Sequence, residues 1–335
     1  MSVRTQHPVV DVGIPSYGRP RYIVETIESV LAQTFTPWRL TISDDGPGGG
    51  DVAAAIAPYL DDPRIRYSPA GARIGVAANW SRVIELATAP YVAILHDDDR
   101  WGPGFLARRV AFLEANPECG FVYSGTKRID EDGAVLAEWR PALEEGDQDV
   151  LTFARRLLTT NIVGSTAAVL VRREAFESVG PTFEGRLPHC DYEMWVRLAL
   201  RFPVGYLDGC DADYRLHRAS TTHRIRPSAK KVLRLADHFV AVADRERPGL
   251  LQRADRRKVR REMLLNALAF DALTTGDRRY ASYLLGRAVA LDPRAAFDPR
   301  AVDWLRIAIG PRLRRLIARR RGRPAKRHTV TELGE

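Results

Sequence analysis

Cysteine is scarce in this sequence, and long apolar runs are absent. The 335 residues include three cysteines, Cys119, Cys190 and Cys210, an odd number without the close spacing of zinc ligands. We therefore expect a reducing compartment and neither a disulfide framework nor a structural zinc site. The N-terminal residues lack the apolar core of a signal peptide, and no run reaches about 18 uninterrupted apolar residues. No transmembrane helix is predicted, and a cytoplasmic location is expected.

The excess of positive charge is confined to the C-terminal tail. Nine Lys or Arg and no Asp or Glu lie in residues 312–328, so the net charge of +9 leaves the rest of the chain neutral. Residues 301–321 are also amphipathic, with an interruption at Gly310-Pro311. Two interpretations of this tail stay open: a solvated terminus, and a basic helix in peripheral contact with the inner face of the membrane.

The first 125 residues alternate between two kinds of periodicity. Strands are predicted at 9–14, 39–43, 65–68, 91–95 and 120–123, and helices at 22–35, 51–60, 77–87 and 105–116. Strands separated by helices of this length predict right-handed crossovers. The expected fold class is therefore α/β, with a Rossmann-like, mostly parallel sheet flanked by helices.

The pattern changes after residue 125, which suggests four regions. Residues 1–125 form a nucleotide-binding half, 126–225 the acceptor half of the same domain, 226–300 a helical C-terminal region, and 301–335 the tail. Within the second half, a tight turn is predicted at 130–133, helices at 151–158 and 191–201, and strands at 165–171, 204–207 and 212–216.

Polar residues follow three of the predicted strands, at 15–17, 44–46 and 96–99. Ligands of parallel α/β sheets bind beyond the carboxyl ends of the strands. The three loops are therefore expected at one ligand-binding edge.

The loop at 96–99 contains three consecutive carboxylates, Asp97, Asp98 and Asp99, preceded by His96. Adjacent carboxylates repel one another, and a divalent cation such as Mg²⁺ or Mn²⁺ relieves that repulsion. A solvated acidic loop that caps the next helix is the structural alternative.

Three other positions could carry chemistry but also have structural interpretations. Asp44 and Asp45 could accept hydrogen bonds from a nucleobase or ribose, or could simply form a turn with Gly46. Asp191 could be a general base or a helix cap. His217 could be a metal ligand, although a lone histidine usually is not one.

The order of these segments resembles the family two glycosyltransferases, inverting enzymes of the GT-A fold. The resemblance spans about residues 9–220. It rests on the segments 12–19, 29–35, 42–46, 74–79, 91–99, 190–191 with Arg197, and 214–217.

The resemblance implies roles for matching positions on the donor side. Pro15 and Tyr17 would line the nucleobase pocket, and Asp45, with Asp44, would bind the base. Asp97 would lie near the ribose. The donor would be a nucleoside-diphosphate sugar, most simply of UDP or dTDP.

The resemblance also implies a metal site and a catalytic base. Asp98 would bind the divalent metal, Mn²⁺ or Mg²⁺, with His217 and Asp99 as further candidate ligands. Asp191 would deprotonate an acceptor hydroxyl of a glycan, a lipid-linked sugar or a small molecule, in cell-envelope polysaccharide synthesis. Two positions depart from the family pattern: His96 replaces the acid that opens the metal motif, and Cys190 replaces a frequent Glu.

Two other functions are alternatives to glycosyl transfer. A nucleotidyltransferase that makes nucleotide sugars would carry a glycine-rich loop with a basic residue after the first strand, and residues 15–19 are not that loop. A non-catalytic protein that binds sugars, nucleotides or nucleic acid could use the basic tail. The main domain lacks interleaved aromatic and basic residues, so no nucleic-acid partner is expected.

Overall fold

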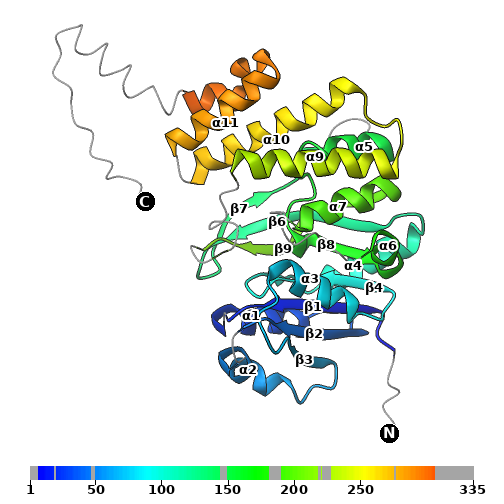
Figure 1. Ribbon diagram of the computed structural model, residues 1–335. Helices are drawn as coiled ribbons and strands as arrows, with labels where there is room; N and C mark the ends of the chain where they lie inside the picture. The colour runs from blue at the N-terminus through cyan, green and yellow to red at the C-terminus, as the bar shows by residue number, and fades with distance from the viewer. Residues whose placement is uncertain are drawn as a thin grey trace, which may run out of the picture. The chain divides into compact units, whose positions relative to one another are not determined.

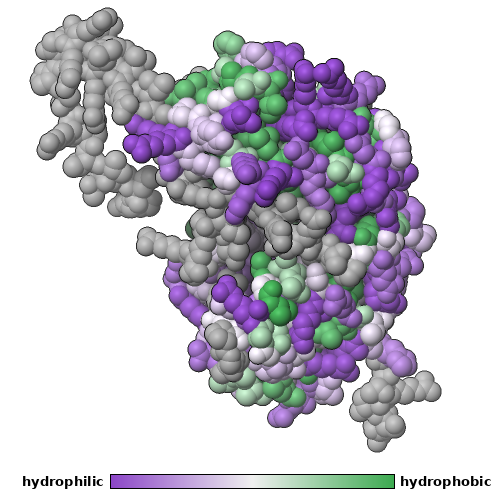
Figure 2. All heavy atoms as spheres, in the orientation of Figure 1, coloured by the Kyte–Doolittle hydropathy of each residue, from purple (hydrophilic) through white to green (hydrophobic). Residues whose placement is uncertain are grey.

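The chain divides into two compact units, Met1–Arg256 and Arg257–Glu335, in a computed structural model. The structure describes residues 7–18, 20–46, 50–143, 149–180, 190–217, 220, 228–274 and 277–305. No helix within these ranges is long and apolar enough to cross a membrane. On the face shown in Figure 2, hydrophilic side chains are the most widespread, with hydrophobic ones in smaller groups between them.

The first unit begins with four parallel strands, as the strand–helix alternation predicts (Figure 1). They are β1 (Val10–Ser16), β2 (Trp38–Asp44), β3 (Ile65–Pro69) and β4 (Tyr91–Ile94). The crossovers contain α1 (Pro20–Leu31), α2 (Gly50–Ile56) with the short 3-10 helix η1 (Ala57–Tyr59), and α3 (Val76–Glu85). The sheet order β3-β2-β1-β4 places the carboxyl ends of these strands at one edge.

The second half of the sheet is mixed. Helix α4 (Phe105–Ala115) lies between β5 (Arg100–Trp101) and β6 (Phe121–Ile129), and β7 (Val135–Trp139), β8 (Val169–Arg172) and β9 (Val204–Arg215) follow. Antiparallel β8 separates β4 from β6, while β6 and β9 are parallel. The mostly parallel α/β class is confirmed, with antiparallel strands added at the far side.

Two predicted strand boundaries in this half are wrong. The segment 165–171 begins with the 3-10 helix η2 (Thr166–Ala168), because the Ser165 hydroxyl caps it by accepting from the Ala167 N–H. The segments 204–207 and 212–216 belong to one strand, β9, which continues through the residues between them. The register of β9 against β6 shifts after Leu207, and no turn forms there. The sequence also gave no sign of β5 or of α6 (Arg173–Val179).

Helices cover both faces of the sheet in the first unit. Residues of α1, α2 and α4 pack with alternate strand residues such as Val12, Leu40 and Ala93 in one core. On the other face, α3 packs on β1, β2 and β4. Gly13 permits this contact, because an added Cβ would lie 2.6 Å from Val83 Cβ. Both faces of the central strands are therefore buried, which explains their nearly continuous apolar sequence.

The remaining helices of the first unit are α5 (Val150–Leu157), α7 (Cys190–Arg201) and α9 (Ala229–Glu246), and α7 packs on α5, α6 and α9. Helix α10 (Arg253–Thr274) begins at the end of this unit. The second unit continues with α11 (Arg278–Leu291) and the 3-10 helix η3 (Pro293–Phe297). Residues 306–335, which include most of the predicted tail, lie outside the described residues.

Candidate donor, metal and base site

The three predicted loops meet at the carboxyl edge of the parallel strands. The Ser16 hydroxyl and the Tyr17 N–H both donate to Asp97 Oδ2, at 2.9 and 3.3 Å. The Asp45 N–H donates to the Ser16 carbonyl at 2.9 Å. Asp97 is fully buried. The loops after β1, β2 and β4 are thus joined by hydrogen bonds centred on Ser16, to which the sequence assigned no role.

Asn79 on α3 fixes the same strand ends from beside the sheet. Its amide nitrogen donates to the carbonyls of Ser16 and Ser43, at 3.1 and 3.0 Å, and its oxygen accepts from the Ser43 hydroxyl. The buried Asn79 side chain therefore holds β1 and β2 in register where they deliver their loops. The motif at 74–79 marked this residue but did not reveal this role.

The predicted base-binding acids are both buried and both engaged within the protein. Asp45 accepts the backbone N–H groups of Ile74 and Gly75 on its two oxygens. Asp44 accepts the Gly46 N–H and, at 2.8 Å, the Tyr67 hydroxyl. Burial and the neighbouring Asp44 carboxylate raise the pKa of Tyr67 to about 12. These acids shape the loops around the predicted base pocket.

Tyr17 is the exposed part of this edge, whereas Pro15 is buried within β1. The Arg73 guanidinium lies over the Tyr17 ring, 4.8 Å from its centroid. The loop that carries Arg73 is the one held by Asp45. The two side chains thus present a ring and a positive charge at the predicted nucleotide edge.

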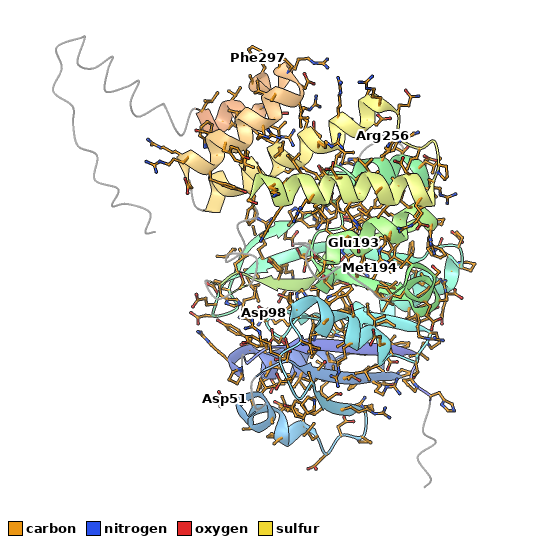
Figure 3. The ribbon with its side chains drawn as sticks, viewed as in Figure 1. Asp51, Asp98, Glu193, Met194, Arg256 and Phe297 are labelled. Atoms are coloured by element: carbon orange, nitrogen blue, oxygen red, sulfur yellow. The ribbon has the colours of Figure 1, made fainter. Side chains whose placement is uncertain are left out.

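Asp98 and His217 form a close, buried pair at the centre of the acidic loop. The His217 Nε2 lies 2.9 Å from Asp98 Oδ2, although the two residues are 119 positions apart. One potential ligand atom each from His96, Asp98 and Asp99 also lie within 4.8 Å of one another. Figure 3 shows Asp98 in the loop that follows β4. The structure therefore brings His217 to Asp98, and it keeps His96 and Asp99 of the predicted metal loop beside Asp98.

Asp99 is buried and only partly satisfied. The Arg215 N–H donates to its Oδ1 at 3.0 Å, while Oδ2 has no hydrogen-bond partner among the described residues. Burial, with the charges of Asp98 and Asp97, raises the pKa of Asp99 well above its ordinary value.

These donors fit a divalent cation. Carboxylate oxygens and an imidazole are suitable ligands for Mn²⁺, and carboxylates for Mg²⁺. A cation would also satisfy the buried oxygen of Asp99 and offset the repulsion between the three acids. Asp98 and His217 would be its most direct ligands, with His96 and Asp99 beside them.

Arg215 ties the acidic loop to the rest of the sheet. Its buried guanidinium donates to the Asp98 carbonyl at 2.9 Å, to the carbonyls of Asp130 and Glu131, and to the Glu25 carboxylate at 2.6 Å. The end of β9, helix α1 and the β6–β7 turn therefore converge on the loop backbone. Arg215 belongs to the motif segment 214–217, but the sequence did not show that it holds the acidic loop, because its partners come from distant parts of the chain.

Asp191 lies in the first turn of α7 and is partly buried. Its Oδ2 accepts a long hydrogen bond, 3.4 Å, from the Thr166 hydroxyl. Thr166 begins η2, which packs against β4, β6 and β9. Through Thr166 the predicted base is therefore linked to η2, which contacts β4, the strand that the acidic loop follows. Burial, and next the Asp191 charge, raise the pKa of Cys190 to about 12. The thiol therefore stays neutral and does not replace the negative charge of the Glu that the family pattern often has at this position.

A buried ion network follows Asp191 on the same helix. Arg197 Nε lies 2.9 Å from Glu193 Oε1, and His238 Nε2 from α9 lies 2.9 Å from the same oxygen. Arg197 also donates to the carbonyls of Val179 and Gly180. Glu193 and Met194 are labelled on α7 in Figure 3. The helix that presents Asp191 is thus fixed to its neighbours on two sides.

The model of glycosyl transferase family 2 matches residues 11–180, which is just over half of the chain. The chain therefore belongs to glycosyl transferase family 2. It is a glycosyltransferase, and the resemblance stated from the sequence motifs is confirmed.

Relatives are named for the synthesis of bacterial polysaccharides. TuaG of Bacillus subtilis (strain 168), named for teichuronic acid biosynthesis, is 28% identical over 225 residues, 67% of this chain and 85% of that protein. WcaA of Escherichia coli (strain K12), named for colanic acid biosynthesis, is 32% identical over 129 residues, 35% of this chain and 46% of that protein.

Solved structures share the fold at low identity. TarS 1–349 of S. aureus in complex with UDP-GlcNAc aligns with a TM-score of 0.60 at 14% identity, over 96% of this chain and 94% of that one. The mannosyltransferase PcManGT of Pyrobaculum calidifontis, in complex with GDP-Man and Mn²⁺, has a TM-score of 0.53 at 17% identity, over 90% and 84%. These alignments confirm the GT-A-like fold.

Proposed function

We propose that this chain transfers a sugar from a nucleoside-diphosphate sugar to an acceptor hydroxyl, with inversion at the anomeric carbon. The observation that carries the proposal is the buried Asp98–His217 pair, 2.9 Å apart, at the edge where the loops of β1, β2 and β4 meet. A divalent cation bound there would offset the charge of the leaving diphosphate. The family assignment favours transfer over the nucleotidyltransferase and non-catalytic alternatives.

The loops of β1 and β2 suggest how the donor is held. Tyr17 offers an exposed ring for the base, and the buried Pro15 and Asp97 are proposed to shape the base and ribose sides of the pocket from within the loops. Asp44 and Asp45 act in part by holding the walls of this pocket, since their oxygens bind backbone and Tyr67 groups. The donor base is proposed as uracil or thymine, although solved relatives hold both UDP-GlcNAc and GDP-Man.

A thermal-shift screen tests the donor and the metal together. UDP, dTDP, GDP and their sugars would each be tested with and without Mn²⁺ or Mg²⁺. A ligand at 100 times its dissociation constant stabilises the folded state by about 2.7 kcal/mol. We expect one base to raise the melting temperature only with metal, and a metal-independent result for every nucleotide would overturn the metal site.

Asp191 is proposed as the general base that takes the proton of the acceptor hydroxyl as it attacks the donor. The Asp191→Asn variant keeps the size of the side chain but cannot accept that proton. We expect turnover to fall by about 10²–10⁴-fold while donor binding in the thermal-shift assay stays unchanged. Equal losses of donor affinity and turnover would count against Asp191 as the base.

The acceptor is proposed to be a glycan or lipid-linked sugar of the bacterial cell envelope, in line with the names of TuaG and WcaA. Such acceptors are compatible with a cytoplasmic enzyme whose basic tail contacts the inner membrane face. A product assay separates transfer from nucleotidyl chemistry, because transfer releases a nucleoside diphosphate and nucleotidyl chemistry releases pyrophosphate.

A further inference from the structure

Trp139, at the end of β7, differs from the other five tryptophans of the chain. Trp38, Trp80, Trp101, Trp195 and Trp304 are all buried. Trp139 is partly exposed, and its indole N–H donates no hydrogen bond to any described residue. A large aromatic side chain thus keeps contact with solvent, on the edge strand of the acceptor half (Figure 1).

The position of Trp139 is tightly fixed despite this exposure. Its ring lies against the Cα of Gly164, where any added Cβ would collide with the six-membered ring. Its carbonyl oxygen lies against Gly125 and accepts from the Cys210 thiol at 3.6 Å. Gly164 has a φ of +76°, and Asn161 braces it with two hydrogen bonds. The ring is therefore held by backbone that only glycine can supply.

The same short segment connects Trp139 to the proposed base. Gly164 contacts the indole, and Thr166, two residues later, donates to Asp191 Oδ2 at 3.4 Å. Two residues span at most about 7 Å between their Cα atoms. The ring and the carboxylate therefore each contact one end of the three-residue segment 164–166.

We propose that Trp139 is the stacking platform for a pyranose ring of the acceptor, whose hydroxyl faces Asp191. Aromatic side chains bind the apolar C–H face of a sugar, while a free indole N–H can donate to its hydroxyls. The inference rests on the proposed glycosyl transfer, and it assigns the acceptor subsite to β7 and the Gly164 turn. The acceptor is thus a cyclic sugar and not an acyclic polyol or a simple alcohol.

Because Trp139 is partly exposed and the other five tryptophans are buried, tryptophan fluorescence can test the proposal directly. The full-length protein, with Mn²⁺ and UDP or GDP, would be titrated with methyl β-glucopyranoside, methyl N-acetyl-β-glucosaminide and methyl α-mannopyranoside. Sorbitol serves as the acyclic control. We expect a saturable change in emission with at least one glycoside, none with sorbitol, and none in Trp139→Phe.

A kinetic comparison then separates binding from mere packing. With the responding glycoside as acceptor, Trp139→Ala should raise the acceptor KM by roughly tenfold and leave the donor KM unchanged. Trp139→Phe should restore the acceptor KM, whereas Trp139→Leu, which still covers Gly164, should not. Leu136→Ala, at a 58% exposed site on the same strand, is the matched control and should behave as wild type.

Two results would overturn the subsite. One is the absence of any glycoside-specific fluorescence change, or its persistence in Trp139→Phe. The other is an acceptor KM that Trp139→Leu leaves at the wild-type value. Glycoside binding to Asp191→Asn, measured by fluorescence, distinguishes the proposed base from the proposed acceptor subsite. If the variant binds the glycoside but no longer transfers sugar, both proposals are supported. If it still transfers sugar, Asp191 is not the base, and the acceptor subsite is unaffected.

Discussion

At the scale of single residues, the Asp98–His217 pair is the feature on which the proposed metal site depends. In Asp98→Ala, the buried imidazole of His217 loses its carboxylate partner, and the proposed metal site loses one of its candidate ligands. We expect the metal-dependent part of the thermal shift with nucleotide to disappear, and the donor KM to rise by at least about tenfold. Mn²⁺ titrations of the melting temperature and of turnover would measure both.

The control for this variant is Asp132→Ala, which removes an 87% exposed carboxylate from the β6–β7 turn. It should leave the metal requirement unchanged. An Asp98→Ala enzyme with the wild-type metal requirement would show that the cation, if any, is held elsewhere.

Asp44 and Tyr67 provide a residue-scale test of what the predicted base-binding acid does. Burial and Asp44 hold the Tyr67 pKa at about 12, above its ordinary value of 10.0. The folded state therefore binds this proton more tightly than the unfolded state, and the stability it contributes is present below pH 10 and lost as the pH rises towards 12. In Asp44→Asn the pKa should move down towards 10.

Phenolate absorbance during an alkaline titration measures this shift, and Tyr67→Phe identifies the contribution of this tyrosine. A Tyr67 transition at the same pH in Asp44→Asn would mean that burial alone sets the pKa of Tyr67.

The sequence named the metal-ligand candidates correctly as neighbours, but not the residues that hold them. Asp98, Asp99 and His217 were recognisable because an acidic loop follows a buried strand and a histidine follows a late strand. Ser16, Asn79 and Arg215 could not be assigned roles, because their partners lie from 29 positions away (Ser16 to Asp45) to 190 positions away (Arg215 to Glu25). Hydrogen bonds across such separations follow from strand order, which local patterns do not specify.

At the scale of elements, the orientation of α7 depends on its buried ion network. Arg197→Ala would leave Glu193 buried with His238 as its remaining side-chain partner in the network, and would remove a donor from the carbonyls of Val179 and Gly180. Removing one member of a buried pair costs about 3–5 kcal/mol. We expect a loss of that size in the free energy of unfolding, measured by urea denaturation.

The matched control is Arg245→Ala on α9, because Arg245 is 64% exposed and Glu246 keeps Arg201 as its other ion-pair partner. It should cost no more than about 1 kcal/mol. If the two variants lose similar stability, the network on α7 does not anchor that helix.

Elements with strong periodicity were predicted well, and short ones were not. The strands β1 to β4 and the helices between them follow from continuous apolar runs and amphipathic spacing. The strand β5, two residues long, exists because Arg100 and Trp101 pair with Asp213 and Ala212 of β9. Tertiary pairing of this kind leaves no periodic signal in so short a segment.

At the scale of the whole molecule, all residues proposed for donor, metal and base lie in the first unit, Met1–Arg256. Hydrogen–deuterium exchange should therefore respond to donor in that unit. With Mn²⁺ and the nucleotide selected by the thermal-shift screen, we expect slower exchange at 15–18, 70–75 and 96–99 and unchanged exchange in α11. Slower exchange confined to α10 and α11 would place the ligand in the second unit.

The sequence by itself determined the family, the α/β class and the set of polar loops, because apolar periodicity and ordered motifs are local properties of the chain. It could not decide that β8 lies between β4 and β6, or that β9 brings His217 to Asp98. Those contacts depend on how strands distant in sequence pair and how helices bury their faces. The tertiary structure alone also placed Trp139 on Gly164, two residues from the partner of Asp191, and so gave the acceptor half a testable site.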